Sequence, residues 1–305
     1  MSTANTINAD DFRVEGEQSV LYVSLAITAV ILVVLSIATM GLVAVATVAS
    51  LAYLRIQQGQ LIGGCVRVSD RQLPEIYRCA RIAAERLSME MPDVFVQQNP
   101  VLNAYAMGFL GMKRSVVIHS ALIEALNDDE LTSVIGHEFG HIKCGHTAWT
   151  VITGSAGQIS IPLISKIMGL VFLLWSRKAE YTADRAGLLA CASLQAAITA
   201  EAKLAIGKQL YDRLDLESLM NQKMELDQDD ISRLSEIMLT HPYAVNRIHA
   251  MKSFFEGVTY RRLTSSGIQV SRTAVRKFCT HCGAEELPGS RFCAGCGKDL
   301  RQDQV

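Results

Sequence analysis

The sequence predicts a mainly helical α+β domain that is anchored in a membrane by an N-terminal apolar segment and followed by a small cysteine-rich module. Three observations lead to this prediction. Residues 20–54 contain no charged side chain, His137 and His141 stand four residues apart, and four cysteines near the C-terminus form two C-x-x-C pairs. The 305-residue chain carries a formal net charge of −1, so no general excess of positive charge favours nucleic acid as a partner.

The chain begins with an acidic N-terminal tail, residues 1–19, and continues into the apolar run of residues 20–54. One bilayer crossing takes about 20 residues, so this run is too long for one simple span and short for two spans with a loop. It is therefore either one long, tilted helix or two short helices that turn near Thr39–Gly41. A helix pair buried in a soluble protein is the remaining alternative. The acidic tail lacks the basic start of a secretory signal.

The charges that flank the apolar run predict its orientation. Only Arg13 precedes the run, whereas five arginines follow it: Arg55, Arg67, Arg71, Arg78 and Arg81. Because basic residues are retained on the cytoplasmic side of a membrane, we expect an integral membrane protein whose main domain and C-terminus are cytoplasmic. In a bacterial cell this is the inner or plasma membrane. With two spans the acidic tail is also cytoplasmic, and with one span it lies on the opposite side.

The main domain is expected to occupy residues 60–256. It opens with a helix around Asp70–Met89, and three short strands follow near Val94–Gln98, Asn103–Phe109 and Ser115–His119. A second helix begins at the acidic, capped sequence Asn127–Glu130 and continues along an apolar stripe. The stripe consists of Leu131, Val134, Ile135, Phe139 and Ile142.

This second helix carries the chemistry of the predicted site. His137 and His141 lie one turn apart on one face, so both imidazoles can bind one metal ion. Glu138 stands between them near the same face, where it can accept a proton from a water molecule. The H-E-x-x-H pattern is typical of zinc peptidases. The alternative is a buried helix that carries two histidines by chance.

A zinc site of this kind needs a third protein ligand. A third histidine close by is excluded, because Gly145 and His146 stand at the wrong offsets and His146 projects away from the ligand face. Glu180 on a later helix can supply the ligand, and Asp184 on the same face can orient a ligand histidine. The alternative is a solvated pair, but small neighbours indicate close packing: Ala179, Ala183, Ala186 and Gly187.

The interval between these two helices, residues 148–175, is a second apolar zone with a single charge at Lys166. Glycines and Pro162 interrupt it. It can enter the bilayer, pack on the first apolar segment or remain in the soluble core. Because the interval lies between the predicted ligands, whatever enters it sits beside the metal site, which would place the zinc near the membrane surface and its lipid.

Taken in order along the chain, four motifs resemble those of the HtpX-type zinc metallopeptidases, which are relatives of the CAAX prenyl endopeptidases. The motifs are Asn103–Gly108, His137–His141, Ser176–Asp184 and His241–Ile248. The resemblance extends from about Asp70 to about Phe255. It implies a zincin-type, gluzincin fold for the main domain and the activity of a zinc-dependent endopeptidase.

The resemblance also implies roles at the metal site. His137, His141 and Glu180 would bind the catalytic zinc, and Glu138 would act as the general base. His241 would approach the metal site, where it would either stabilise the oxyanion or cap the zinc in a resting state.

Further roles follow from the same resemblance. Arg247 would support the late histidine of the fourth motif. The first motif would form an edge strand that pairs with an extended substrate peptide, and backbone pairing of this kind suits broad specificity. Its candidate substrate-binding residues are Asn103, Ala104, Tyr105 and Ala106.

Residues 278–300 predict a second zinc site, a structural zinc ribbon. Cys279 and Cys282 form one C-x-x-C-G turn, and Cys293 and Cys296 form another, so four thiolates can surround one zinc ion. A unit this small needs a metal to be stable, and the alternative of disulfides fits poorly with a reducing cytoplasm. Residues 257–277 precede the ribbon as a basic linker. The ribbon is expected to dock a partner protein, a substrate or the protease itself.

These features together predict a membrane-bound, zinc-dependent endopeptidase that hydrolyses peptide bonds and carries one catalytic and one structural zinc ion. Its expected substrates are polypeptides, above all misfolded or membrane proteins, in membrane-protein quality control. One alternative is a specific processing protease of lipidated C-termini, which the small number of spans disfavours. Another is a non-catalytic membrane adaptor that acts through the zinc ribbon, which the presence of Glu138 disfavours.

Overall fold

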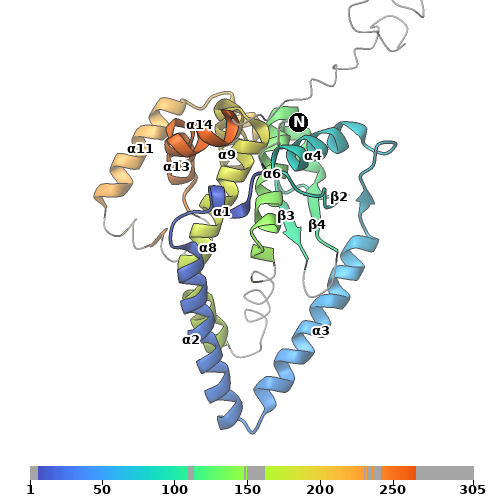
Figure 1. Cartoon of the computed structure of the whole chain (residues 1–305), viewed down its shortest axis with the longest axis vertical. Helices are drawn as coiled ribbons and strands as arrows, with labels where there is room; N and C mark the ends of the chain where they lie inside the picture. The colour runs from blue at the N-terminus through green and yellow to red at the C-terminus, as the bar shows by residue number, and fades with distance from the viewer. Residues whose placement is uncertain are drawn as a thin grey trace, which may run out of the picture. The chain divides into compact units, whose positions relative to one another are not determined.

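The structure is a computed structural model of the 305-residue chain, and it describes residues 6–108, 113–147, 149, 162–229, 231, 235–236 and 242–265. The chain divides into two compact units, Met1–Ser266 and Gly267–Val305. The first unit is mainly helical and contains a four-stranded sheet (Figure 1). The predicted mainly helical α+β class is therefore confirmed. The second unit, with the predicted zinc ribbon and its four cysteines, lies outside the described residues.

The acidic N-terminal stretch packs on the main domain instead of forming a detached tail. It contains the short helix α1 (Ala9–Phe12), in which Phe12 is fully buried. The backbone amide of Val14 donates to Oγ1 of Thr182 at 2.9 Å, which joins residues far apart in the sequence. Buried Phe12 and Ile7 and this hydrogen bond together hold the stretch on the domain.

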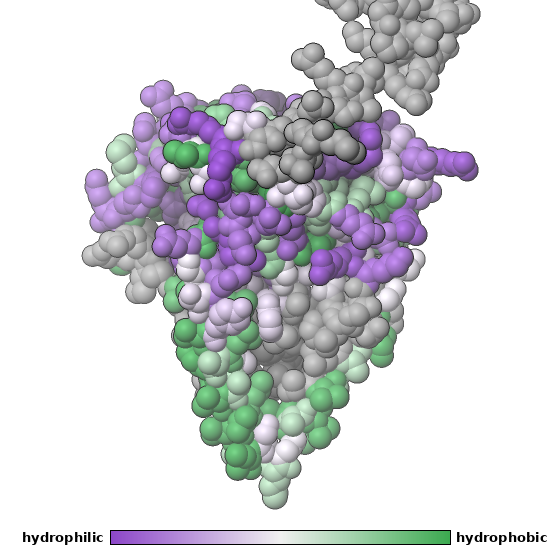
Figure 2. Space-filling view, in the orientation of Figure 1, coloured by the Kyte–Doolittle hydropathy of each residue, from purple (hydrophilic) through white to green (hydrophobic). Residues whose placement is uncertain are grey.

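Two helices follow, α2 (Glu17–Ala38) and α3 (Leu42–Gly63), and the chain reverses between them. Met40 and Gly41 adopt positive φ angles of 50° and 84° at the reversal, close to the predicted turn. Among the described helices, only α2 is long and apolar enough to cross a membrane. Figure 2 shows hydrophobic side chains gathered over the end of α2 and the start of α3. Exposed members of this group include Ile37, Met40 and Leu42.

The sheet has the strand order β1-β2-β4-β3. Its strands are β1 (Val66–Arg67), β2 (Asp93–Gln97), β3 (Ala104–Met107) and β4 (Ser115–His119), and α4 (Pro74–Arg86) connects the first two. β2 and β4 are parallel, whereas β3 runs antiparallel to β4 with Ala104 opposite Ile118. Every residue of β4 is buried. Because β3 is the last strand in this order, it lies at the edge of the sheet, as the family resemblance implies.

The chain then forms α5 (Ser120–Ala125) and α6 (Asp128–Lys143), the helix that carries the H-E-x-x-H pattern. α6 starts with a capping box, in which the Asn127 side chain accepts from the Glu130 amide at 3.0 Å and the Glu130 side chain accepts from the Asn127 amide at 3.0 Å. These contacts satisfy backbone donors that a helix start otherwise leaves unpaired. The predicted start of this helix agrees with the structure.

The next described helix, α8 (Pro162–Cys191), joins the apolar zone to the predicted third-ligand motif in one continuous element. Its first half lies along α2 (Figure 1), where Trp175 and Phe172 pack with Leu21. The hydroxyl of Ser24 donates to the carbonyl of Val171 at 2.8 Å. Its second half packs on α6. The described part of the second apolar zone is therefore a helix that lies against the first apolar segment.

The remaining helices complete the domain on the side opposite the α2–α3 turn (Figure 1). They are α9 (Leu194–Ile206), α10 (Lys208–Tyr211), α11 (Leu216–Gln228), α13 (Ala244–Glu256) and α14 (Val258–Ser265). α14 corrects the predicted linker, because residues 258–265 are helical and bury Tyr260 and Leu263. The ring of Tyr260 packs on Phe254 of α13. The first unit thus extends to Ser266 instead of ending at residue 256.

Candidate active site

Glycines bring α6 and α8 into direct contact. A Cβ atom at Gly187 of α8 would lie 2.7 Å from the carbonyl oxygen of Ser133, and one at Gly136 of α6 would lie 2.2 Å from the Cβ of Ala190. Both separations are too short for any side chain. The small residues around Glu180 therefore serve close helix packing, which faces this side chain toward the histidines of α6.

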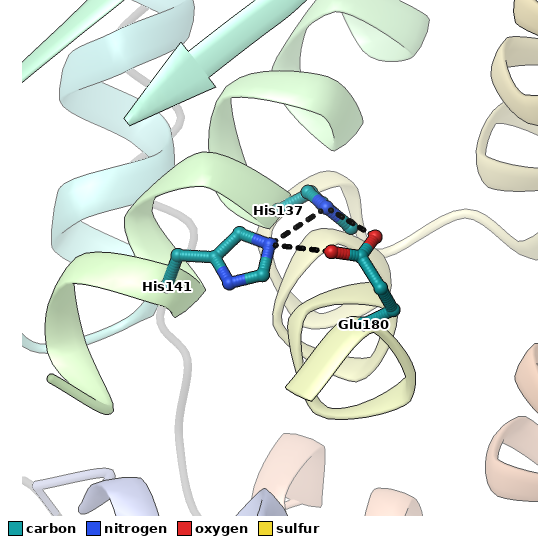
Figure 3. A group of neighbouring side chains, drawn as sticks. All are labelled: His137, His141 and Glu180. Carbon is teal, nitrogen blue, oxygen red and sulfur yellow. Dashed lines mark hydrogen bonds and ion pairs between the residues drawn. The ribbon is translucent and has the colours of Figure 1, made fainter. Parts of the chain in front are cut away.

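His137, His141 and Glu180 offer three metal-ligand atoms that lie within 4.8 Å of one another (Figure 3). The two Nε2 atoms are 3.1 Å apart. The Glu180 oxygens lie 3.5 Å from Nε2 of His137 and 3.4 Å from Nε2 of His141. Two imidazoles and one carboxylate with space for further ligands are the donor set of a catalytic zinc site.

The surroundings of His137 define its protonation. Its Nδ1 donates to Oδ1 of Asp184 at 3.0 Å, so the neutral ring that a metal ion would bind has its lone pair on Nε2, which faces Glu180. Burial lowers the pKa of His137, but the Asp184 and Glu180 carboxylates outweigh burial and raise the pKa to about 10. Without a metal, the negative charge of the two carboxylates thus favours a proton on His137, and a divalent cation that displaces this proton would fit the same arrangement.

Asp184 is held by a buried ion-pair network. Nε of Arg247 donates to Oδ2 of Asp184 at 2.9 Å, and Nη1 of Arg247 lies 2.9 Å from Oε1 of Glu201. Although burial opposes ionisation, Arg247 and His137 hold the pKa of Asp184 below its ordinary value. Arg247 therefore contacts the carboxylate that orients His137. Sequence analysis did not identify Glu201, because the alanine-rich α9 gives no signal for it.

A cleft of about 250 Å³ is lined by two of the three candidate ligands, His137 and Glu180. Glu138 lines this cleft together with Asn103 and Ala104 at the start of β3. No strand among the described residues pairs with the outer edge of β3. Tyr105 and Ala106 are not part of the cleft lining, and the Tyr105 hydroxyl donates to the side-chain oxygen of Gln97 at 3.3 Å.

Three helices, α6, α9 and α13, supply further lining residues on the other face of the cleft. Except for the charged residues of the ion-pair network, most of these side chains are small or apolar: Val134, Ala197, Ala200, Leu204 and Met251. A polypeptide paired to β3 would lay alternate side chains toward this face.

His146 occupies a position that sequence analysis did not foresee. α6 ends at Lys143, and Gly145 with φ of 76° turns the chain back. Nδ1 of His146 consequently lies 3.0 Å from Nδ1 of His141, on the side of the ring away from Glu180. Burial lowers the pKa of His146 to about 4, although its hydrogen bond to Glu17 acts in the opposite direction. His146 is therefore a neutral neighbour of the candidate ligand and does not point at the metal position.

Two sets of predicted site residues lie outside the described residues. One is His241, although the following Pro242 and the rest of its motif are described. The other is the ribbon set, Cys279, Cys282, Cys293 and Cys296.

The chain is similar in sequence to known proteins. The model of peptidase family M48 matches residues 70–254. The plastoglobule-localized metallopeptidase 48, a chloroplastic protein of Arabidopsis thaliana, is 33% identical over 216 residues, which cover 66% of this chain and 63% of that protein. Among solved structures, the crystal structure of S. mikatae Ste24p matches with a TM-score of 0.39 and 18% identity, over 61% of this chain and 51% of that chain.

Proposed function

Because the chain belongs to peptidase family M48, we propose that it is a membrane-bound, zinc-dependent endopeptidase that hydrolyses peptide bonds in polypeptide substrates. The observation that carries this proposal is the convergence of His137, His141 and Glu180 beside a cleft that Glu138 also lines. A metal-ligand triad, a carboxylate and room for a polypeptide are the parts that metal-assisted peptide hydrolysis requires.

Each residue of the candidate site would have a separate role in peptide hydrolysis. His137, His141 and Glu180 would hold the ion, with Asp184 fixing the proton of His137 on Nδ1. Bound zinc supplies a Lewis acid that polarises the substrate carbonyl and acidifies the attacking water. Glu138 accepts the proton from that water and passes it to the leaving amine.

Substrate would bind along β3. The start of this edge strand lines the cleft beside Glu138, and its outer backbone groups can pair with an extended peptide. Asn103 and Ala104 line the cleft together with Glu138, and Tyr105 and Ala106 continue the strand beyond its lining. Recognition through backbone groups selects an extended, unfolded chain more than a particular sequence. His241 would stabilise the oxyanion, in keeping with the position of its motif before α13.

The membrane part of the proposal depends on α2 and its neighbours. α2 has the length and hydropathy of a span, and α3 returns the chain toward the sheet. The first half of α8 lies against α2 and leads directly to Glu180. The site would thus open close to the membrane surface on the cytoplasmic side, where segments of misfolded membrane proteins are accessible. We propose membrane-protein quality control as the role, with the zinc ribbon of residues 278–300 as a docking module.

Degradation of a model membrane protein by the purified chain in detergent tests this function. Glu138→Gln removes the proton acceptor but retains the three candidate ligands, so zinc binding and folding should persist. Proteolysis should fall by at least about 100-fold, the usual contribution of a general base. Chelation should abolish the activity of the wild type, and added zinc should restore it.

Glu124→Gln provides a matched control, because this glutamate is exposed on α5 and lies outside the cleft. Its activity should equal that of the wild type. Undiminished proteolysis by Glu138→Gln would remove the proposed mechanism, and activity that survives complete chelation would remove the requirement for zinc.

A further inference from the structure

The two candidate histidine ligands differ in what binds the nitrogen that faces away from Glu180. His137 donates its Nδ1 proton directly to a carboxylate, that of Asp184. His141 instead has Nδ1 of His146 at 3.0 Å, and Nε2 of His146 lies 3.0 Å from Oε1 of Glu17. His141 is therefore also linked to a carboxylate, that of Glu17, but the imidazole of His146 lies between them.

The hydrogen bonds in this chain assign one consistent arrangement of protons. For Nε2 of His141 to face the metal position as a lone pair, its Nδ1 must carry the proton and donate it to Nδ1 of His146. His146 must then carry its own proton on Nε2, which donates to Glu17. Because the carboxylate of Glu17 can only accept, it selects this tautomer of His146 and, through it, the tautomer of His141.

The side chain of Glu17 is buried and held by several hydrogen-bonding and charged partners. Its side chain and that of His146 are each 1% exposed. The carboxylate accepts a second hydrogen bond from the hydroxyl of Thr182 and pairs with the guanidinium of Arg13. Thr182 lies on α8 between Glu180 and Asp184, so the same helix supplies a metal ligand and a contact for Glu17. A buried carboxylate with this many aligned partners has one orientation.

Glu17 is also the first residue of α2, the helix with the properties of a membrane span. We propose that Glu17 and His146 are positioning residues for the zinc ligand His141, so that the N-terminal segment and the start of the membrane helix are parts of the metal site. This inference rests on the proposed zinc site. It assigns a role to a residue outside the 70–254 region that matches the family model.

Zinc retention by the purified full-length chain tests the proposal. Zinc that remains bound would be measured against a graded series of a competing chelator, and the full-length Glu180→Ala chain would define the zinc held elsewhere. His146→Phe keeps a ring against Trp175 but removes both nitrogens, and Glu17→Ala removes the carboxylate. Loss of such outer contacts lowers metal affinity by about 10- to 100-fold, and we expect this range for His146→Phe and about tenfold for Glu17→Ala.

The double variant separates positioning from general stabilisation. If Glu17 acts through His146, Glu17→Ala should have no further effect on zinc affinity once His146→Phe is present. His146→Gln, which restores one acceptor and one donor, should recover most of the affinity. Glu15→Gln, an exposed neighbour on the same segment, should bind zinc as the wild type does. If Glu17→Ala fails to fold, Glu17→Gln keeps the shape without the charge and should show a smaller loss in the same direction.

Three results would overturn the inference. Zinc affinities of both single variants within twofold of wild type would show that the contacts do not position His141. Additive losses in the double variant would show that Glu17 acts independently of His146. A wild-type chain that holds no more zinc than Glu180→Ala would remove the metal site itself, and that outcome is distinct because it appears before any outer contact is changed.

Discussion

At the scale of single residues, the candidate metal centre depends on which nitrogen of each ligand histidine carries the proton. For His137 the choice is made by Asp184, which Arg247 holds in place from α13. Asp184 contacts Nδ1 of His137, and His146 contacts Nδ1 of His141. Each ring consequently turns its Nε2 toward Glu180. The two histidines alone would bind zinc weakly without this support.

The charge at His137 makes the metal-free protein sensitive to pH. Burial lowers the pKa of His137, but Asp184 and Glu180 raise it from 6.5 to about 10. A pKa that is raised in the folded state contributes stability that is fully present below the unfolded value and is lost as the pH rises toward the folded value. Chelator-treated protein should therefore become less stable from pH 7 to pH 9, by at most about 1.4 kcal/mol per pH unit from this group.

Thermal unfolding of chelator-treated wild type and His137→Asn across this pH range measures the effect. The wild type should lose stability more steeply than the variant, which lacks the titrating ring. His249→Gln on α13 serves as a control and should follow the wild type, because His249 hydrogen bonds to the carbonyl of Met220 away from the site. Equal slopes for wild type and His137→Asn would contradict the proposed charge state.

Some residues of the site could be predicted from the sequence, and others could not. His137, Glu138, His141 and Glu180 stand out because helical spacing alone places them on shared faces. His146 lies off the ligand face, as the helical spacing predicts, but its contact with Nδ1 of His141 could not be predicted, because it depends on the end of α6 at Lys143 and the turn at Gly145. Glu17 and Glu201 carry no local pattern, since their partners are far away in the sequence and only tertiary packing brings them together.

At the scale of elements, the contact between α6 and α8 determines whether the three candidate ligands converge. The glycines and alanines at this contact leave no room for a further methyl group. The distance between the helices therefore sets the distance from Glu180 to both imidazoles.

Gly187→Ala should separate these helices and weaken the metal site. Its added Cβ would meet the Ser133 carbonyl oxygen at 2.7 Å, and overpacking of this kind costs about 1–3 kcal/mol. We expect a lower thermal midpoint and lower zinc retention, both measured on the full-length chain. Gly59→Ala in α3 is the matched control, because nothing lies within 4 Å of its added Cβ, and it should be neutral or stabilising by up to about 1 kcal/mol. Identical behaviour of the two variants would argue against the tight contact.

The elements themselves were predictable to different degrees. The predicted strands near residues 94–98, 103–109 and 115–119 lie where β2, β3 and β4 are found, because apolar runs bounded by polar residues mark them clearly. β1 has only two residues and offers no pattern. The arginines of residues 258–265 predict a basic linker, whereas the structure has the helix α14 there, which buries Tyr260 and Leu263.

At the scale of the whole molecule, the N-terminal segment restricts the topology. Residues 7–17 contact α8 through Val14, and they contact Cys144 and His146, just after α6, through Arg13 and Glu17. A segment packed on the main domain must lie on the same side of a membrane as that domain. Under the proposed membrane anchoring, the chain would leave along α2 and return along α3, so we propose the hairpin among the topologies that the sequence leaves open.

Reporter fusions at the two ends of the chain test this topology. Fusions before Met1 and after Val305 should both report the cytoplasm, because the first end shares a side with the main domain and arginines follow the apolar segment. A reporter inserted between Met40 and Gly41, at the reversal, should give the opposite signal. Opposite signals at the two termini would contradict the hairpin.

The C-terminal unit beyond Ser266 can be tested separately from the protease. Because the helices of the first unit end at Ser265 and α14 is packed on α13, truncation after Ser266 should leave the catalytic unit complete, whereas truncation after Glu256 would also remove α14. We expect the shortened chain to lose about one of two zinc ions per molecule and to hydrolyse a small unstructured peptide as the wild type does. Degradation of a membrane-embedded substrate should slow, because the proposed docking module is gone.

Cys279→Ser in the full-length chain separates loss of the ribbon zinc from loss of the segment, and it should reproduce both the missing zinc and the slower degradation. Loss of peptide hydrolysis in a folded truncation would make the C-terminal unit part of the catalytic machinery. Unchanged degradation of the membrane substrate would remove the docking role. In that case recognition of substrate would depend on the first unit alone, through β3 and the helices that place the cleft beside the membrane.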